Sequence, residues 1–430
     1  MNQFRVGVDI GGTFTDIVLL GVDGTVHTKK ISSSVENYAQ AIVDGLAELF
    51  GEVGLDGKAI EEIRHGTTVA SNAILEHKGA KVGLITTRGF RDVLEIRTLR
   101  MPRLYDIGWT KPKPLVERHL RVVVDERIDA QGRIERALDP ADAERAVQAL
   151  LGQGVEAIAV CLLNSFTNPV HELMIRDAVR RAAPDLPLSV SYEVLPEIKE
   201  YERTSTTVVN AYVMPIVARY LRSLRQGLDR AGIPAQVLLM QSNGGLTTDA
   251  AAAERPMNII ESGPAGGVVG AQALARAKDL PRIITFDMGG TTAKAAMVED
   301  GEVSRAAEYS VGAGIMIGSR LLTGAGYELR RQDRQAAGHD RRARGAGRAP
   351  DRGVEHDPRH QGGVDRARPR STGVRALRLR RQRAAVRLRH GRRTRDAPHR
   401  RAACGGSVLF LRPALRRRRA SVCAHLPPSL

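Results

Sequence analysis

The stretch from Val6 to Asp16 holds the first residues whose types and spacing suit chemistry. Gly11 and Gly12 would let a bulky anion approach the backbone N–H groups, because neither residue has a Cβ. Hydroxyl and carboxylate side chains stand around this glycine pair: Asp9, Thr13, Thr15 and Asp16. Such a turn suits a phosphate-bearing ligand together with Mg²⁺, which neutralises phosphate charge. An ordinary β-hairpin with a polar tip would show the same pattern.

A second copy of this design lies far along the chain. It repeats the spacing Asp-x-Gly-Gly-Thr and adds a lysine: Asp287, Gly289, Gly290, Thr291, Thr292 and Lys294. Because apolar strand-like runs flank both copies, each one reads as a hairpin. The repeat predicts that the two turns face each other across a cleft and hold a nucleotide's phosphates from both sides.

Three further stretches are candidates for the site. His65, Thr67 and Thr68 fall where a strand gives way to a helix, a place that favours anions, although a lone histidine there is often a structural hydrogen-bonder. Gly263 belongs to a glycine-rich loop before a helix, which suits a phosphate or carboxylate or is a plain helix-entry turn. The segment 200–207 is either a ligand wall or a solvated helix face.

Alternating strands and helices must position these residues, and the alternation favours an α/β fold. Helices are expected at 35–50, 140–151 and 197–228. Strands are expected at 4–8, 17–20, 26–30, 82–87, 157–163, 188–192, 236–240, 295–298 and 302–309.

Composition separates the first 330 residues from the last hundred. The chain of 430 residues carries a formal charge of +17, yet residues 331–430 hold 28 arginines, no lysine and seven acidic residues. The first part is therefore mildly acidic. The three cysteines show no paired spacing, which favours a reducing cytoplasm over a disulfide framework. We expect no signal peptide and no membrane association, since no apolar run approaches the length of a membrane span.

Regular periodicity ends near residue 330. A basic arm for nucleic acid is one interpretation of the arginine-rich tail, but such an arm would mix lysine with arginine and carry aromatic residues. We favour out-of-frame translation of a GC-rich gene, and therefore expect a disordered tail and no nucleic-acid partner. The run from Arg380 to Arg383 fits this hypothesis, because codons for Phe-Gly-Gly-Asn-Gly, read from each third base, can give Arg-Arg-Gln-Arg.

Taken together, the motifs resemble the hydantoinase/oxoprolinase family, specifically its A-type subunit. The matching stretches are 9–16, 65–73, 84–95, 201–207, 262–267 and 287–294. The resemblance implies an actin/sugar-kinase-like (ASKHA, ribonuclease H-like) two-lobed ATPase whose second lobe is incomplete here, because the family's glycine-rich continuation is absent. The expected regions are an N-terminal lobe at 1–195, the start of a hydantoinase A domain at 196–329 and the out-of-frame tail at 330–430.

The resemblance implies ATP-dependent opening of a cyclic amide such as 5-oxoproline or a hydantoin, usually with a B-type partner subunit. The lactam carbonyl oxygen would attack the γ-phosphate, and water would then open the phosphorylated ring. Asp9 and Asp287 would organise Mg²⁺ through water, Lys294 would offset phosphate charge, and the two glycine–threonine turns with Gly263 would hold the nucleotide. His65, Thr67, Thr68, Arg203 and Thr204 would face the substrate. A small-molecule kinase of the same fold and a non-catalytic truncated chain are the two rival hypotheses.

Overall fold

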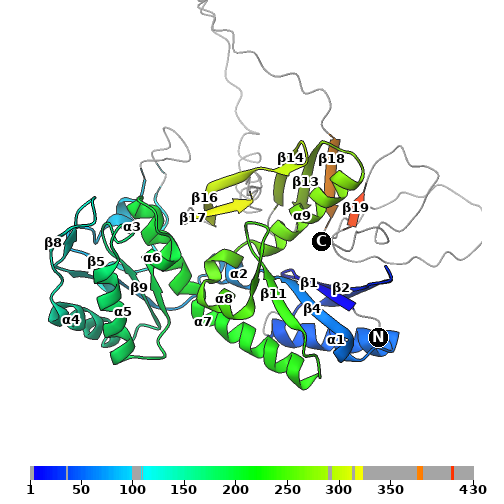
Figure 1. The fold of residues 1–430 in the computed structure, drawn as a ribbon, viewed down its shortest axis with the longest axis horizontal. Helices are drawn as coiled ribbons and strands as arrows, with labels where there is room; N and C mark the ends of the chain where they lie inside the picture. Colours follow the sequence, from blue (N-terminus) through cyan, green and yellow to red (C-terminus); the bar gives the residue numbers. More distant parts are fainter. Residues whose placement is uncertain are drawn as a thin grey trace, which may run out of the picture.

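A computed structural model describes residues 4–34, 37–98, 108, 110–288, 293–311, 315–322, 375–380 and 408–410. These residues form a mixed α/β fold of three sheet-containing parts, with one long helix running between the first two (Figure 1). The α/β class predicted from the sequence is confirmed.

The first part is a six-stranded sheet whose strand order is β12-β11-β4-β1-β2-β3. β1, β2 and β3 form an antiparallel meander, while β4 and β11 add in parallel to the other side of β1. The alternating burial of β1 shows why its apolar residues stand at every second position. The strands span Phe4–Ile10, Phe14–Gly21, Val26–Ser32, Ile60–Gly66, Gln236–Met240 and Leu246–Thr248.

Helix α1 (Tyr38–Val53) covers one face of this sheet, as the apolar spacing predicted. Its start is capped by Asn37, whose side chain accepts a hydrogen bond from the Gln40 N–H. Gly54, with φ of 69°, ends it in the left-handed conformation that glycine tolerates. The predicted helix at 35–50 is therefore confirmed with its bounds moved by three residues.

The second part is a parallel sheet of order β10-β9-β5-β6. Its central strands β5 and β9 are buried at every position, as expected for strands covered on both faces. The strands are β5 (Val82–Thr87), β6 (Arg121–Val124), β9 (Ala157–Cys161) and β10 (Leu188–Val190). The helices α4 (Pro140–Leu151), α5 (Val170–Ala182) and α6 (Ser191–Val194) contact its strands, while α3 (Val93–Ile96) packs against the long helix described next. The sequence predicted strand through 192, but the chain turns into α6 at Ser191, where the serine hydroxyl and the Tyr192 N–H bond Glu172.

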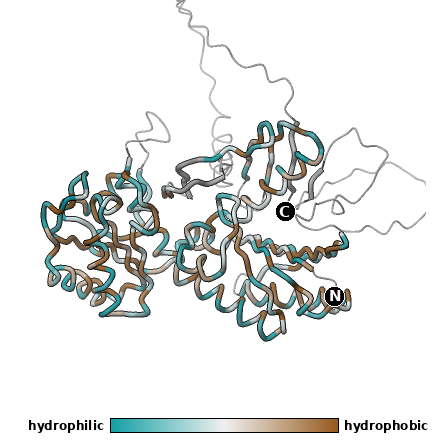
Figure 2. The backbone as a smooth tube through the Cα atoms, in the orientation of Figure 1, coloured by the Kyte–Doolittle hydropathy of each residue, from teal (hydrophilic) through white to brown (hydrophobic). Residues whose placement is uncertain are grey.

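Helix α7 (Glu200–Arg230) joins the first two parts. It packs against α1 and β9, and it also contacts the hairpin of β16 (Arg305–Val311) and β17 (Ile315–Leu322) through β17. Figure 2 shows apolar residues concentrated along the central strands that α7 covers, with hydrophilic residues along the outer turns. In the part of the chain that the structure describes, no helix, α7 included, combines the length and apolarity of a membrane span.

The third part repeats the layout of the first. Its strand order is β15-β14-β13-β18-β19, with β13, β14 and β15 antiparallel and β18 parallel to β13, just as β4 is parallel to β1. Helix α9 (Ser262–Ala277) packs against β13. The strands span Arg282–Met288, Ala293–Glu299, Glu302–Val303, Arg375–Arg380 and Val408–Phe410. The strand predicted at 302–309 is divided into β15 and β16.

Two strands come from the tail, where none was predicted. β18 pairs with the free edge of β13, and β19 pairs with β18. A strand edge presents unpaired N–H and C=O groups that favour such pairing, whatever the side chains of the added strand. At these nine positions the structure differs from a disordered tail. The remaining described elements are η1 (Gly57–Ala59), α2 (Val69–Leu75), η2 (Arg118–Leu120), β7 (Arg127–Ile128), β8 (Ile134–Arg136), α8 (Asp249–Glu254) and η3 (Pro256–Ile259).

Candidate functional site

The carboxyl ends of the parallel strands β1, β4 and β11 meet at one edge of the six-stranded sheet. Asp9 lies opposite Gly66 in the register, and His65 lies opposite Leu239. In open α/β sheets ligands bind at this edge, so the topology brings the first hairpin and the stretch 65–68 to one place.

Hydrogen bonds from Ser33 stabilise the tip of the first hairpin. The Ser33 hydroxyl donates to the Gly11 carbonyl at 2.8 Å, and the Ser33 N–H donates to the Thr13 carbonyl at 3.0 Å. Gly12 and Thr13 are exposed at the tip. Thr15 is fully buried, with its hydroxyl 3.0 Å from that of Ser33, so it supports the turn from inside rather than facing a ligand. Ser33 was not predicted, and only its place just after β3 could have indicated this role.

Asp9 lies against the backbone of two other predicted site segments. A Cβ built on Gly66 would lie 3.2 Å from the Asp9 Oδ1 atom, and one built on Gly263 would lie 3.0 Å from it. Both contacts are tighter than ordinary packing, so glycine at these two positions makes room for the carboxylate. The structure thus brings together Asp9, the end of β4 and the start of α9.

Hydrogen bonds hold the N-terminus of α9 in this place. Ser262 Oγ donates to the Thr67 carbonyl at 2.8 Å and accepts from the Thr67 N–H at 2.9 Å. The N–H of Glu261, the N-cap residue, donates to Ser71 Oγ at 3.2 Å, and Glu261 has a positive φ of 68°. The 16-residue helix therefore directs the positive end of its dipole toward Asp9. Ser262 and Glu261 stand in the predicted loop but were not predicted as site residues.

The second hairpin reaches the same helix end. Asp287 and Lys294 are cross-strand partners on β13 and β14. The Lys294 ammonium forms an ion pair with the carboxylate of Glu261, two residues before Gly263. The predicted residues Gly289, Gly290, Thr291 and Thr292 lie outside the described residues. In the described part of the chain no group of three or more metal-binding side chains occurs.

His65, at the end of β4, links β1 and helix α7 through hydrogen bonds of its ring. His65 is buried, with Nδ1 3.2 Å from the Val8 carbonyl oxygen and Nε2 2.6 Å from the Tyr220 hydroxyl. Burial lowers the pKa of His65 to about 4, so the imidazole is neutral at pH 7. Burial also raises the pKa of Tyr220 well above its usual value. This geometry fits the structural interpretation of the histidine rather than substrate contact.

The two threonines make local contacts at the β4–α2 turn. Thr67 is buried and its hydroxyl accepts from the Val69 N–H at 3.2 Å. Thr68 is half-buried and its hydroxyl donates to the Ile10 carbonyl at 3.3 Å, which ties this turn to the end of β1. Of the two, Thr68 retains access to the shared edge.

Arg203 and Thr204 point away from that edge, toward the second sheet. The Arg203 guanidinium donates to the Leu162 carbonyl at 2.7 Å and to the Ser165 hydroxyl. Thr204 Oγ1 lies 3.2 Å from the sulfur of Cys161, and burial raises the pKa of that thiol. All these side chains are buried, so they fasten α7 to the loop after β9. Burial likewise raises the pKa of Glu172, although three hydrogen bonds to its carboxylate oppose that shift.

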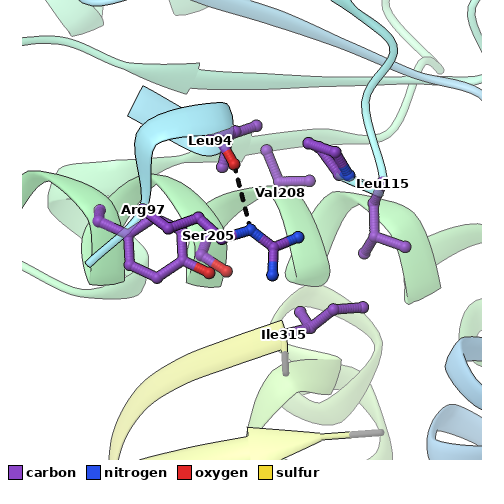
Figure 3. A pocket seen from close by; sticks show the side chains of 8 residues that line it. Leu94, Arg97, Leu115, Ser205, Val208 and Ile315 are labelled. Carbon is purple, nitrogen blue, oxygen red and sulfur yellow. Dashed lines mark hydrogen bonds between the residues drawn. The ribbon is translucent and has the colours of Figure 1, made fainter. Parts of the chain in front are cut away.

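A separate small cavity of about 20 Å³, room for roughly one water molecule, lies between the second part, α7 and β17. Figure 3 shows the guanidinium of Arg97 between Leu94, Ser205, Val208 and Ile315. Nothing in the sequence indicates this pocket, because its walls come from three regions distant in the chain. Its lining residues are Leu94, Arg97, Pro114, Leu115, Tyr201, Ser205, Val208 and Ile315.

Two family models and several curated proteins match this chain. The family model described as the hydantoinase/oxoprolinase N-terminal region matches residues 5–183, and the one described as hydantoinase/oxoprolinase matches residues 203–330. Caprolactamase subunit alpha of Pseudomonas jessenii is 38% identical over 297 residues, which cover 68% of this chain and 43% of that one. 5-Oxoprolinase of Saccharomyces cerevisiae is 30% identical over 363 residues, covering 75% of this chain and 28% of the relative.

Two solved structures have a fold similar to that of this chain. The ATP-dependent caprolactamase from Pseudomonas jessenii superposes with a TM-score of 0.68 at 35% identity, over 74% of this chain and 47% of that chain. A nucleotide-free acetone carboxylase also gives a TM-score of 0.68, at 26% identity, over 75% of this chain and 48% of the other. The chain therefore spans about half the length of these solved structures, and half or less of the curated relatives named above.

Proposed function

The chain belongs to the hydantoinase/oxoprolinase family, and from this premise we propose that it is the nucleotide-binding part of an ATP-dependent cyclic amide hydrolase. The family includes proteins named for ATP-dependent caprolactam and acetone chemistry and for 5-oxoproline. The observation that carries the proposal is the meeting of Asp9, Gly66 and Gly263 at the start of α9.

The strand layout supports an actin/sugar-kinase-like arrangement of two related lobes. The orders β3-β2-β1-β4 and β15-β14-β13-β18 have the same directions, with a hairpin at the head of each and a parallel strand beside it. Lys294 of the second hairpin pairs with Glu261 at the helix whose Gly263 contacts Asp9. Two hairpins joined through one helix end suit a ligand with several phosphates.

Charge explains why a cation belongs to this proposal. Asp9 and Glu261 already place two carboxylates near the start of α9, and a triphosphate would add further negative charge. Mg²⁺ is usually held by one or two carboxylates together with phosphates and waters, so Asp9 and Asp287 fit a water-mediated site without a dedicated cluster. When bound, the ion would offset phosphate charge during transfer.

ATP would be consumed as the phosphoryl donor that activates the ring carbonyl for opening by water. The residues of this chain would position its phosphates: exposed Gly12 and Thr13 at the first tip, Thr68 at the sheet edge and the N–H groups of α9. Thr15, Thr67 and His65 would hold these elements in place from the interior. A B-type subunit is proposed as the partner, since relatives are named as the subunits of larger enzymes.

Calorimetric titration of the purified full chain with ATP and MgCl₂ tests the proposal. Asp9→Ala should weaken binding at least tenfold, because it removes the carboxylate at the start of α9. Asp44→Ala is the matched control, since Asp44 is exposed on α1 and should leave binding unchanged. Equal affinity of the wild type and Asp9→Ala, or no nucleotide binding by the wild type, contradicts the assignment.

A further inference from the structure

The second hairpin carries a positive charge at the position where the first hairpin carries a negative one. Asp16 lies opposite Asp9 in the strand register, and Lys294 lies opposite Asp287. Each stands the same number of residues after the aspartate of its motif. Side chains directly opposite each other on neighbouring strands lie on one face of a sheet. The two hairpins therefore present opposite charges at equivalent positions.

These two charges are neutralised in different ways. Asp16 Oδ1 accepts from the ammonium of Lys30 at 2.7 Å, and Lys30 is its cross-strand neighbour on β3, so that pair lies within one sheet. Lys294 instead pairs with Glu261, which belongs to another element, the N-cap position of α9. The strand register fixes a pair within a sheet. A pair between a strand and a helix end can open without unpairing any strand.

Glu261 occupies a backbone position that does not suit glutamate. Its φ of 68° and ψ of 22° lie in the left-handed region, where a Cβ is unfavourable and glycine is the usual residue. An N-cap side chain commonly accepts from the N–H groups of the first helical turn, but the side chain of Glu261 makes no such bond. The carboxylate is directed to Lys294. Contact with Lys294 is therefore what a glutamate side chain provides at this strained position.

The ion pair is partly shielded from solvent and lies beside the proposed phosphate site. The side chain of Glu261 is 15% exposed and that of Lys294 is 24% exposed. Partial burial strengthens the attraction between opposite charges, because less water screens it. Glu261 precedes Gly263 by two residues, and a Cβ built on Gly263 would lie 3.0 Å from the Asp9 Oδ1 atom. An anion of the protein thus already engages Lys294 where the proposed function places the phosphates.

We propose that Glu261 is an internal competitor of the nucleotide: its carboxylate holds the Lys294 ammonium until a phosphate of ATP displaces it. The inference rests on the proposed function, which supplies the phosphate ligand, and it adds a residue that regulates the affinity for that ligand. Because two anions compete for one ammonium, removal of the carboxylate should favour the contact between Lys294 and the phosphate. Removal of a residue that only supported the fold would not raise the affinity.

Calorimetric titration of the purified full chain with ATP and MgCl₂ measures this competition. Glu261→Gln keeps the size of the side chain and should bind ATP at least about threefold more tightly than the wild type, as expected for loss of a partly exposed ion pair. Glu261→Gly should also tighten binding, and it tests the competition even if glutamine disturbs the start of α9, because glycine tolerates the positive φ. Unchanged or weaker binding by both variants overturns the proposal.

A second background separates the ion pair from a general effect of negative charge. In Lys294→Met, the change Glu261→Gln should give less than about half of the gain in affinity on a logarithmic scale, because no ammonium is left to compete for. An equal gain in both backgrounds would mean that Glu261 acts through charge repulsion alone, which overturns the proposal. Glu302→Gln is the control, since exposed Glu302 pairs with Arg276 in the last turn of α9 and should leave the affinity unchanged.

Thermal unfolding of each variant shows whether it is folded before its binding is interpreted. Failure of this proposal is distinguishable from failure of the proposed function. ATP binding that weakens in Asp9→Ala but does not tighten in either Glu261 variant would remove the competition alone. Absence of ATP binding by the wild type and by both Glu261 variants would remove the nucleotide function and the competition together.

Discussion

At the scale of single residues, the structure divides the predicted site into side chains that face the shared edge and side chains that build it. His65 illustrates the second kind. Its two ring nitrogens are both engaged, by the Val8 carbonyl and the Tyr220 hydroxyl, in a buried setting. A protonated imidazole there would lose solvation without gaining a carboxylate among its described partners.

The pH dependence of stability follows from this burial. Because the folded-state pKa of His65, about 4, lies below its ordinary value of 6.5, the unfolded chain binds the proton more tightly. The stabilisation is complete above pH 6.5 and is lost as the pH falls toward 4, by about 3 kcal/mol in total. The free energy of unfolding, measured by denaturant titration across this pH range, should fall more steeply with decreasing pH for the wild type than for His65→Gln, by the amount given above. Parallel curves for the two proteins would contradict a buried neutral histidine.

The structure brings some of the predicted site residues together and turns others away from the shared edge. Asp9 and Lys294 were predicted from the repeated motif and Gly263 from its glycine-rich loop, and the structure brings the three to one helix end. Arg203 and Thr204 carried the right chemistry for a substrate wall, but the rotation of α7 turns them into the interior. Periodicity along one helix cannot show which of two neighbouring sheets a polar face will meet.

At the scale of elements, α7 depends on close approach to α1. A Cβ built on Gly227 would lie 2.7 Å from the Val43 Cγ2 atom, so the two helices meet where one residue has no side chain. Gly51, near the end of α1, has nothing within 4 Å of such an added atom. Both glycines are helical, and so the gain in helix propensity on substitution by alanine is similar for both.

Comparison of Gly227→Ala with Gly51→Ala isolates the contribution of α1–α7 packing to the free energy of unfolding. Gly227→Ala should lower the free energy of unfolding by about 1–3 kcal/mol, because Val43 is β-branched and has little room to move. Gly51→Ala should raise it by about 0.5–1 kcal/mol through reduced backbone entropy of the unfolded chain. Urea unfolding measures both. Stabilisation by both substitutions would mean that α1 and α7 are not packed as closely as the structure has them.

The elements themselves were largely predictable, because amphipathic spacing predicted α1 and α7, and apolar runs predicted β5, β9 and β11. What the sequence could not show was their assembly. β11 joins the first sheet from more than 160 residues away, across the boundary predicted at 195 and 196, and nothing in its apolar run indicates β4 as its neighbour. Sheet order depends on tertiary packing, to which local patterns contribute little.

At the scale of the whole molecule, one strand of the third part comes from an unexpected region of the chain. β18 pairs with β13 in the place that β4 takes beside β1, yet its residues Arg375–Arg380 belong to the arginine-rich tail. A change of reading frame would leave the strand position beside β13 in the architecture, but residues of atypical composition would fill it. We therefore carry the out-of-frame hypothesis forward as a proposal about the gene.

The nucleotide sequence tests it at four codons. Arg380, Arg381, Gln382 and Arg383 directly follow or end β18. If they are encoded as CGG-CGG-CAA-CGG, the same bases read one position later give Gly-Gly-Asn-Gly, a turn whose glycines suit close approach of a phosphate or a strand end. We expect these codons, together with a single-base insertion or deletion between codons 325 and 335 relative to a gene whose frame is intact. Expression of the frame-corrected gene should then yield a chain without the excess of arginine after residue 330 and with tighter ATP binding than the present one. Arginine codons at these positions that give no glycine in the shifted frame would exclude the hypothesis, and the tail would have to be explained as a native basic segment.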